Sequence, residues 1–227
     1  MEHIPLFVSA TFMLAAFLAV FLFLKSNSFH RISFFILAAW LMLQAILSLN
    51  YFYSDTSIVP PRFPLLIFPP MLVIGILFLT KKGRIFIDCF DLKTLTLLHV
   101  VRIPVEFVLL WLSIYKVVPQ LMTFEGRNFD ILSGLTAPLI YYFGFVRKIM
   151  NKKMVLAWNF ICLGLLINIV VNAVFSVPFA FQKFGFEQPN IAVLYFPFVW
   201  LPCCIVPLVL LSHLIVIRKL ILSSSIK

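Results

Sequence analysis

The segment "TLTLLHVVRIPVEFVLLWLSIYKVV", residues 94–118, decides the class of this protein. It is long and apolar enough to cross a hydrocarbon core of about 30 Å as a helix, which takes roughly 17–25 residues. Yet it contains His99, Arg102 and Glu106, and ionisable side chains are energetically costly inside a bilayer. We therefore expect a membrane-spanning helix whose ionisable residues serve a specific purpose.

The composition of the whole chain leads to the same class. Hydrophobic residues make up 63% of the 227 residues and charged residues only 11%, whereas soluble domains hold about 45–50% apolar and about 25% charged residues. Phe is in large excess, with 27 residues. These values exclude an ordinary soluble domain and predict an all-α, polytopic integral membrane protein.

Apolar runs of spanning length divide the chain into seven expected transmembrane helices, which form a single bundle over residues 1–227. The third and fifth runs are close to the lower length limit for a span. The seventh contains Pro197, Pro202 and Pro207, so we expect that helix to be bent or locally unwound. The seven runs cover residues of about 5–24, 32–53, 64–80, 94–118, 131–146, 154–179 and 191–217.

Lys and Arg are distributed unequally between the connections on the two sides of such a bundle. One side collects thirteen basic residues, at positions 25, 31, 81, 82, 84, 93, 147, 148, 152, 153, 218, 219 and 227. The other side holds only Arg62, Lys116, Arg127 and Lys183. Cytoplasmic loops carry the Lys and Arg excess, so the pattern predicts seven transmembrane helices with the N-terminus outside and the C-terminus cytoplasmic.

The net charge of +10 is explained by the basic residues of the expected cytoplasmic connections. No basic run is interleaved with aromatic residues on a soluble module, so we expect no nucleic acid partner. The expected partners are the lipid bilayer and anionic lipid headgroups at the cytoplasmic face, for which "RKIMNKK", residues 147–153, is the strongest patch. The expected location is a bacterial inner membrane.

The ionisable residues of the fourth run lie on one face of the expected helix. At about 100° per residue, His99, Arg102 and Glu106 fall within a sector of about 60°. One hypothesis is a polar path in which Glu106 accepts a proton or cation and Arg102 tunes its proton affinity. The other is a buried ion pair between Arg102 and Glu106 that holds neighbouring helices in register.

Partners for this polar stripe are expected on other runs and in one loop. Gln44 in the second run and Asn168 and Asn172 in the sixth are candidates, although hydrogen bonding between helices alone explains most such residues. Residues 119–134 form the most polar outer connection. There Glu125, Arg127 and Asp130 are candidates for the rim of an outward-facing cavity, and Asp130 also suits the N-cap of the fifth helix. Alternatively, Glu125 and Arg127 pair with each other across the turn.

Histidines leave a cofactor as an alternative. His99 and His213 are expected at similar depths, about 6–9 Å inside the cytoplasmic surface, so they are the candidates for ligands of haem or a metal in this alternative. The sequence contains no C-x-x-C-H or H-E-x-x-H motif. No cofactor is therefore predicted, and the four cysteines, including adjacent Cys203 and Cys204, predict no disulfide.

Two segments resemble those of a group of small bacterial multi-span membrane proteins whose activity is uncharacterised. They are "HVVRIPVE", residues 99–106, and "TFEGRNFDILSGLTAP", residues 123–138. The resemblance implies a multi-span fold and carries no activity. Three functions stay open: a small transporter or channel-like protein with a proton- or cation-linked path, a membrane-embedded enzyme or redox protein with histidine ligands, and a receptor-like or structural subunit.

Overall fold

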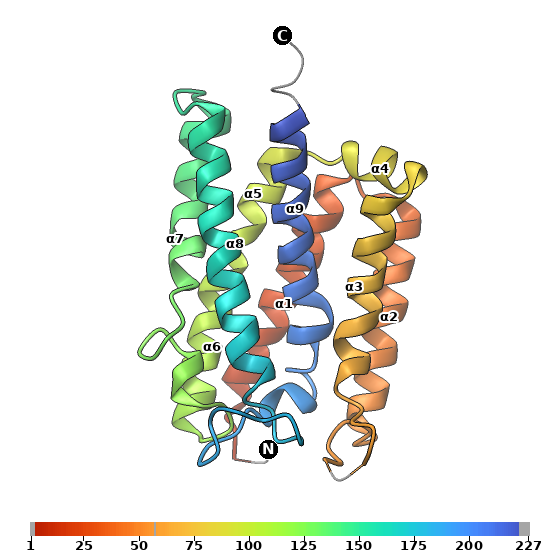
Figure 1. The fold of residues 1–227 in the computed structure, drawn as a ribbon, viewed down its shortest axis with the longest axis vertical. Coiled ribbons are helices and arrows are strands. Elements are labelled where there is room, and N and C mark those ends of the chain that lie inside the picture. The colour runs from red at the N-terminus through yellow and green to blue at the C-terminus, as the bar shows by residue number, and fades with distance from the viewer. Residues whose placement is uncertain (1–2, 57, 223–227) are drawn as a thin grey trace.

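The computed structural model describes residues 3–56 and 58–222, which form an all-helical bundle without any strand (Figure 1). Short 3-10 turns or π-helical segments join or extend several of the helices. The helices are α1 (Leu6–Ser26), α2 (Arg31–Leu49), α3 (Pro64–Leu79), α4 (Lys81–Asp88), α5 (Leu92–Leu98), α6 (Arg102–Ile114), α7 (Ile131–Ile140), α8 (Lys152–Val174) and α9 (Val206–Leu222).

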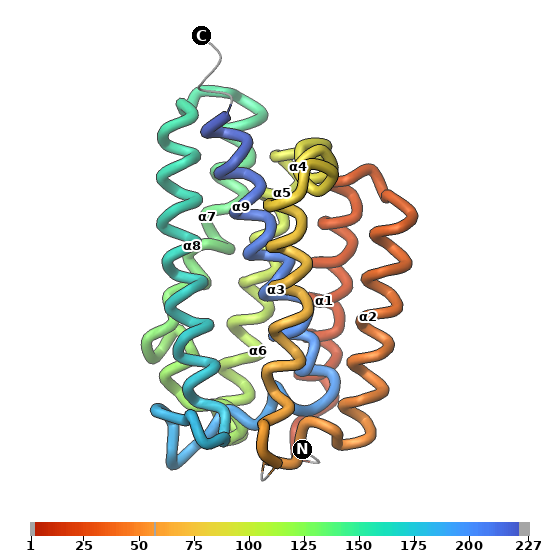
Figure 2. Tube along the Cα trace, turned by 45° about the vertical axis from the view of Figure 1, so that its right-hand side comes forward, coloured from red at the N-terminus to blue at the C-terminus, as the bar shows by residue number. Residues whose placement is uncertain are grey.

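The chain runs back and forth along one axis, so that α1 begins at the opposite end of the bundle from the end of α9 (Figure 1). The helix α9 lies centrally and contacts α3, α5 and α8, while α1 packs along α5 and α6. The short helix α4 lies across the end at which α9 finishes (Figures 1 and 2). We call that end the C-terminal end and the other the N-terminal end.

Five helical segments are long and apolar enough to cross a membrane: Leu6–Ser26, Arg31–Leu49, Leu92–Ile114, Lys152–Val174 and Leu201–Leu222. Together α3 and α4 would make a sixth, but they meet at a bend of 93°. The fifth expected run corresponds to the shorter apolar segment Ile131–Val146. Helices compatible with a membrane protein are thus present.

The fourth run is one long helical segment with a local change of winding at its polar residues. A 3-10 turn at His99–Val101 separates α5 from α6. Pro104 is the third residue of α6 and cannot donate to the carbonyl of Val100 four residues earlier. At the start of α5, Asp91 accepts hydrogen bonds from the Thr94 backbone N–H and hydroxyl. Burial alone raises the pKa of Asp91, but these bonds lower it below its ordinary value.

The connection between α6 and α7 rises part-way along the bundle before α7 begins (Figures 1 and 2). Its turn is tight at Gly126, where a Cβ would collide with the backbone of Gln120 and Leu121. Farther along, α7 packs against the 3-10 turn of the fourth run, and a Cβ on Gly134 would lie 3.3 Å from the carbonyl oxygen of His99. The loop end is therefore carried into the interior, next to the polar stripe.

The seventh run is irregular, as its prolines predict. Its first ten residues, 191–200, form turns and a short 3-10 segment, and a π-helical segment (Leu201–Ile205) leads into α9. Pro207 cannot donate to the carbonyl of Cys203 four residues earlier. Trp40 Nε1–H on α2 donates to that carbonyl instead, at 2.9 Å. This bond helps to hold the peripheral α2 against the bundle.

The two ends of the bundle differ in charge. At the C-terminal end, Arg218 pairs with Asp88 at 3.3 Å, and Lys219 donates to the carbonyls of Asp88 and Phe90. Lys227, assigned to the same side by sequence, lies outside the described residues. The basic residues at or next to helix ends there are Lys25, Arg31, Lys81, Lys82, Arg84, Lys93, Arg147, Lys148, Lys152, Lys153, Arg218 and Lys219.

Candidate functional site

The polar stripe of the fourth run lies in the interior of the bundle. His99, Arg102 and Glu106 have exposed fractions of 0%, 3% and 2%. Arg102 stands ten residues from the start of the 23-residue segment Leu92–Ile114, which is about 15 Å at 1.5 Å per residue. The charged groups of the stripe therefore lie near the middle of that segment, far from either end.

Arg102 is bound by groups from three other parts of the chain. Its Nη1 donates to Asp130 Oδ1 at 2.7 Å and lies 3.4 Å from the carbonyl oxygen of Cys162. Its Nη2 lies 2.8 Å from His213 Nε2. The ion pair of Arg102 among the described residues is thus with Asp130, whereas the sequence suggested Glu106, its neighbour one turn away. Asp130 comes close because the preceding segment rises into the bundle.

The hydrogen bonds of His213 fix its protonation state. Arg102 has only donors, so His213 Nε2 must accept from it. The proton then lies on Nδ1, which donates to Asn159 Oδ1 at 2.9 Å, and Asn159 Nδ2 donates to the carbonyl of Val155. His213 is therefore neutral with its proton on Nδ1. His99 stacks on it, with ring centroids 3.9 Å apart and planes inclined by 19°.

Glu106 has a different environment. Asn128 Nδ2 donates to both of its carboxylate oxygens, at 2.6 and 2.7 Å. The amide of Asn128 is held in this orientation because its Oδ1 accepts from the backbone N–H of Asp130 at 3.0 Å. No salt bridge to Glu106 occurs among the described residues. Its carboxylate is held by a neutral amide donor.

We call His99, Arg102, Glu106, Asn128, Asp130, Asn159 and His213 the buried polar cluster. It contains one guanidinium, two carboxylates and a neutral His213, while His99 has no hydrogen-bond partner on either ring nitrogen within residues 3–56 and 58–222. With both carboxylates ionised and His99 neutral, the cluster carries one excess negative charge. An uncompensated buried charge is costly, so the cluster favours uptake of one proton or one monovalent cation.

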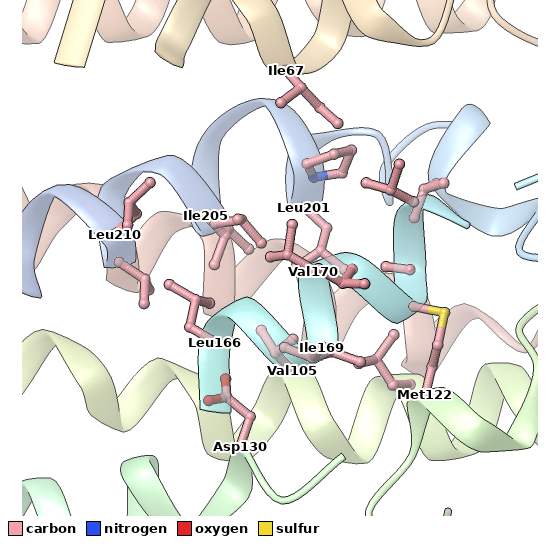
Figure 3. Close-up of a pocket in the computed structure, with 18 of the residues that line it drawn as sticks. Ile67, Val105, Met122, Asp130, Leu166, Ile169, Val170, Leu201, Ile205 and Leu210 are labelled. Atoms are coloured by element: carbon pink, nitrogen blue, oxygen red, sulfur yellow. The ribbon is translucent and has the colours of Figure 1, made fainter. Parts of the chain in front are cut away.

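A cavity of about 190 Å³ adjoins the cluster. Arg102, Glu106 and Asp130 line it together with apolar side chains of α3, α6, α8, α9 and the π-helical segment. Figure 3 shows the Asp130 carboxylate on one side of this cavity, below Leu166, with Ile67 of α3 on the opposite side. The charged groups therefore meet an almost wholly apolar space.

The other polar residues suggested by sequence bind elsewhere. Gln44 accepts from the Tyr53 hydroxyl at 2.7 Å. Asn168 donates to the carbonyl of Arg127, and Asn172 donates to the carbonyl of Asn168. Of the three rim candidates, Glu125 and Arg127 are exposed, whereas Asp130 is 5% exposed. A rim at Glu125 and Arg127 stays a prediction.

Asn128 donates hydrogen bonds to Glu106 but is not among the site residues that the sequence indicates. One signal was available, because the fifth run has only 16 residues and covers about 24 Å at 1.5 Å per residue, less than the hydrocarbon thickness. The polar residues just before a short run are therefore expected to lie within the membrane. Asn128 and Asp130 are those residues.

A haem or metal at His99 and His213, the alternative that the sequence leaves open, would compete with the contacts that His213 makes. Both ring nitrogens of His213 bond to protein groups, so a ligand there would displace Arg102 or Asn159. Within the described ranges, no group of three or more His, Cys, Asp or Glu residues is arranged to hold a metal ion. His213 would thus have to change its partners before it could coordinate.

Comparison with known proteins yields one family. Residues 61–221 match the model described as "Domain of unknown function (DUF8737)". The match extends from just before α3 almost to the end of α9 and includes every residue of the buried polar cluster. No curated protein and no solved structure matches the chain. The chain therefore belongs to the family Domain of unknown function (DUF8737).

Proposed function

We propose that this is a seven-span carrier in a bacterial inner membrane that binds and moves a proton or another small cation at Glu106. The observation that carries the proposal is the charge balance of the buried polar cluster. Two carboxylates face one guanidinium, and the guanidinium is already paired with Asp130. Glu106 is left as the group whose charge needs compensation, and intramembrane ionisable residues of this kind commonly mark ion pathways.

The proposed topology has the N-terminus outside and the C-terminus in the cytoplasm. It counts α3 as the third span and the rising segment together with α7 and its π-helical extension (Tyr141–Val146) as the fifth. The accumulation of Lys and Arg at the C-terminal end supports this orientation. We expect that end to contact anionic headgroups, chiefly through the α7–α8 connection.

A carrier agrees better with the site than an open channel does. Glu106 and His99 are almost completely buried, and the space beside Glu106 is apolar, which disfavours a continuous water path. Exchange with either side therefore requires a change of conformation. The π-helical segment Leu201–Ile205 lines the cavity, and irregular winding of this kind often occurs at functional sites.

Proton flux into liposomes tests the proposal. The purified protein is reconstituted in vesicles of neutral and anionic phospholipid, and the internal pH is followed after an external pH jump. We expect Glu106→Gln to reduce the protein-dependent flux by about tenfold or more, because an amide cannot take up the proton. The matched control is Glu125→Gln, which removes an exposed carboxylate and should leave the flux unchanged.

Equal flux with wild-type and Glu106→Gln protein would refute the role of Glu106. The flux comparison is made only between samples with the same elution volume in size-exclusion chromatography and the same helical circular dichroism signal. A lost flux in a correctly folded variant is then due to the missing carboxylate. Co-purification of a partner together with no flux in any variant would favour a structural subunit instead.

A further inference from the structure

The cavity beside the cluster has the composition of a ligand site. Three of its lining residues, Arg102, Glu106 and Asp130, are ionisable, and nearly all of the others are apolar. Ligand sites commonly combine apolar walls with a few polar groups that orient the ligand. The two carboxylates alone do not identify the ligand. A buried polar atom of the same lining that has no hydrogen-bond partner in the described part of the chain gives further evidence for one.

Asn190 supplies this atom. It lines the cavity and is completely buried. Its Nδ2 donates to the carbonyl of Ala173 at 3.2 Å, and its backbone N–H donates to the carbonyl of Ser176 at 2.8 Å. Its Oδ1 has no hydrogen-bond partner among the residues that the structure describes. A buried acceptor without a donor is unfavourable, so a ligand that supplies an N–H or O–H is expected to bind favourably.

The charges of the lining select the kind of ligand. Glu106, Asp130 and Asn190 are acceptors, which call for a ligand rich in donors. The Nε–H of Arg102 is an unpartnered donor within the described residues and would suit an anion. Two carboxylates line the same cavity, however, and like charges repel strongly in an apolar medium. A cationic ligand therefore has the better electrostatic match.

The volume limits the size of the ligand. A dry cavity of about 150 Å³ in another protein accommodates benzene, and the present cavity is somewhat larger, at about 190 Å³. One aromatic ring or a branched alkyl group with a short polar chain is of suitable size. Larger lipids and multi-ring compounds would have to widen the site.

The lining residues on α3 and α8 indicate the route of entry. Ile67 and Met71 on α3 and Ile167 and Val171 on α8 all line the cavity. Ile167 and Val171 are also exposed on the outer surface of the bundle. In the proposed topology that surface faces lipid, so the ligand reaches the site from the bilayer, between α3 and α8.

We propose that this cavity binds a small apolar ammonium ion, with its apolar body between α3, α8 and α9 and its N–H donors directed to the acceptors of the lining. The inference rests on the proposed function, since the ammonium supplies the same single positive charge as the proton on Glu106. The two therefore compete for one site, and a bound ammonium ion displaces the proton of Glu106. The other charged groups around Glu106 are Arg102 and Asp130, which compensate each other.

Calorimetric titration of the full-length protein in detergent micelles tests this ligand class. Three probes share one phenyl ring: 2-phenylethylammonium, neutral 2-phenylethanol and anionic 3-phenylpropanoate. We expect the ammonium to bind at least about thirtyfold more tightly than either of the others, and Glu106→Gln to lose a similar factor. Binding should release protons into the buffer, seen as a dependence of the heat on the buffer's ionisation enthalpy.

A steric pair of variants tests the position of the ligand. Ile67→Phe extends a side chain into the cavity and should weaken ammonium binding by about tenfold or more. The control Leu72→Phe adds the same ring to an exposed position of α3 and should leave binding unchanged. Equal effects of the two changes would refute binding in this cavity.

The outcomes separate this inference from the proposed function. Proton flux that depends on Glu106, without preferential binding of the ammonium, overturns the ligand class and leaves the carrier proposal intact. Equal binding of the neutral probe, or tighter binding of the anion, also overturns it. Ammonium binding that is unaffected by Glu106→Gln refutes the competition with the proton. A proton flux that is equal in wild-type and Glu106→Gln protein refutes the proposed function itself.

Discussion

Asp130 and Glu106 are both buried carboxylates of one cluster, but the protein surrounds them differently. Asp130 pairs directly with Arg102, which also bonds to His213, and His213 is in turn held by Asn159. We call Arg102, Asp130, His213 and Asn159 the Arg102 arm. It connects α6, the start of α7, α8 and α9. Among the described residues, Glu106 accepts side-chain hydrogen bonds only from the neutral amide of Asn128. Both carboxylates line the cavity.

The difference separates two roles that the sequence could not distinguish. The Arg102 arm is compensated in charge and satisfied at most of its polar atoms, which suits a group that holds four elements in register. Glu106 forms no salt bridge with a cation in residues 3–56 and 58–222, which suits a group that gains and loses a charge. Under the proposed function, Arg102 therefore has the structural role and Glu106, on the same helix, is the group that exchanges charge.

The largest effect is expected when the Arg102 arm is broken on one side. Arg102→Leu leaves the Asp130 carboxylate buried without its cation and should lower the free energy of unfolding by about 3–5 kcal/mol. The double variant Arg102→Leu/Asp130→Leu removes both charges and should recover a large part of that loss. Denaturant titration in detergent micelles, followed by tryptophan fluorescence, measures both.

An exposed ion pair provides the control for this experiment. Arg218→Leu breaks the pair with Asp88 at the C-terminal end, where water screens the charges, and should cost no more than about 1 kcal/mol. If the double variant of the Arg102 arm is as unstable as the single one, Asp130 is not the energetic partner of Arg102. Comparable losses from Arg102→Leu and Arg218→Leu would likewise remove the distinction between buried and exposed pairs.

The helices could be predicted from the sequence, whereas the partners within the cluster could not. Apolar run length and helical periodicity depend on local sequence, so the helical segments and the shared face of His99, Arg102 and Glu106 follow from it. Pairing depends on how segments distant in sequence pack. Asp130 is 28 residues from Arg102 and His213 is 111 away, and neither separation has a periodic signature.

The position of the loop before α7 was the main obstacle. A polar segment between two apolar runs ordinarily lies at the membrane surface, so the sequence predicts Asp130 at an outer rim. The compact turn at Gly126 and the close packing of Gly134 on the 3-10 turn bring the loop inside instead. Short-range sequence rules describe each of these glycines but not their combined effect on the path of the chain.

An intermediate effect is expected at the far end of the Arg102 arm. Asn159→Leu removes the acceptor of the His213 Nδ1–H and should lower the free energy of unfolding by about 1–2 kcal/mol. The matched control is Asn168→Leu on the same helix, at an exposed position, which should cost less. A double-mutant cycle of Asn159→Leu with His213→Leu measures their coupling, and additive losses would show that the two residues act independently.

The smallest effect on stability is expected at Glu106, and a pair of amide substitutions isolates it. Glu106→Gln keeps an acceptor for Asn128 and removes an uncompensated buried charge, so the free energy of unfolding should change by less than about 1 kcal/mol. Asp130→Asn is the same chemical change at the other carboxylate, but it leaves the Arg102 guanidinium unpaired and should be clearly more destabilising. Denaturant titration of the two variants side by side gives the difference directly.

Equal unfolding midpoints would mean that Glu106 is as firmly paired as Asp130 and could not serve as the exchangeable site. A stable Glu106→Gln protein that has lost its proton flux would instead show that the stability of the bundle depends on Asp130 and that proton transport depends on Glu106.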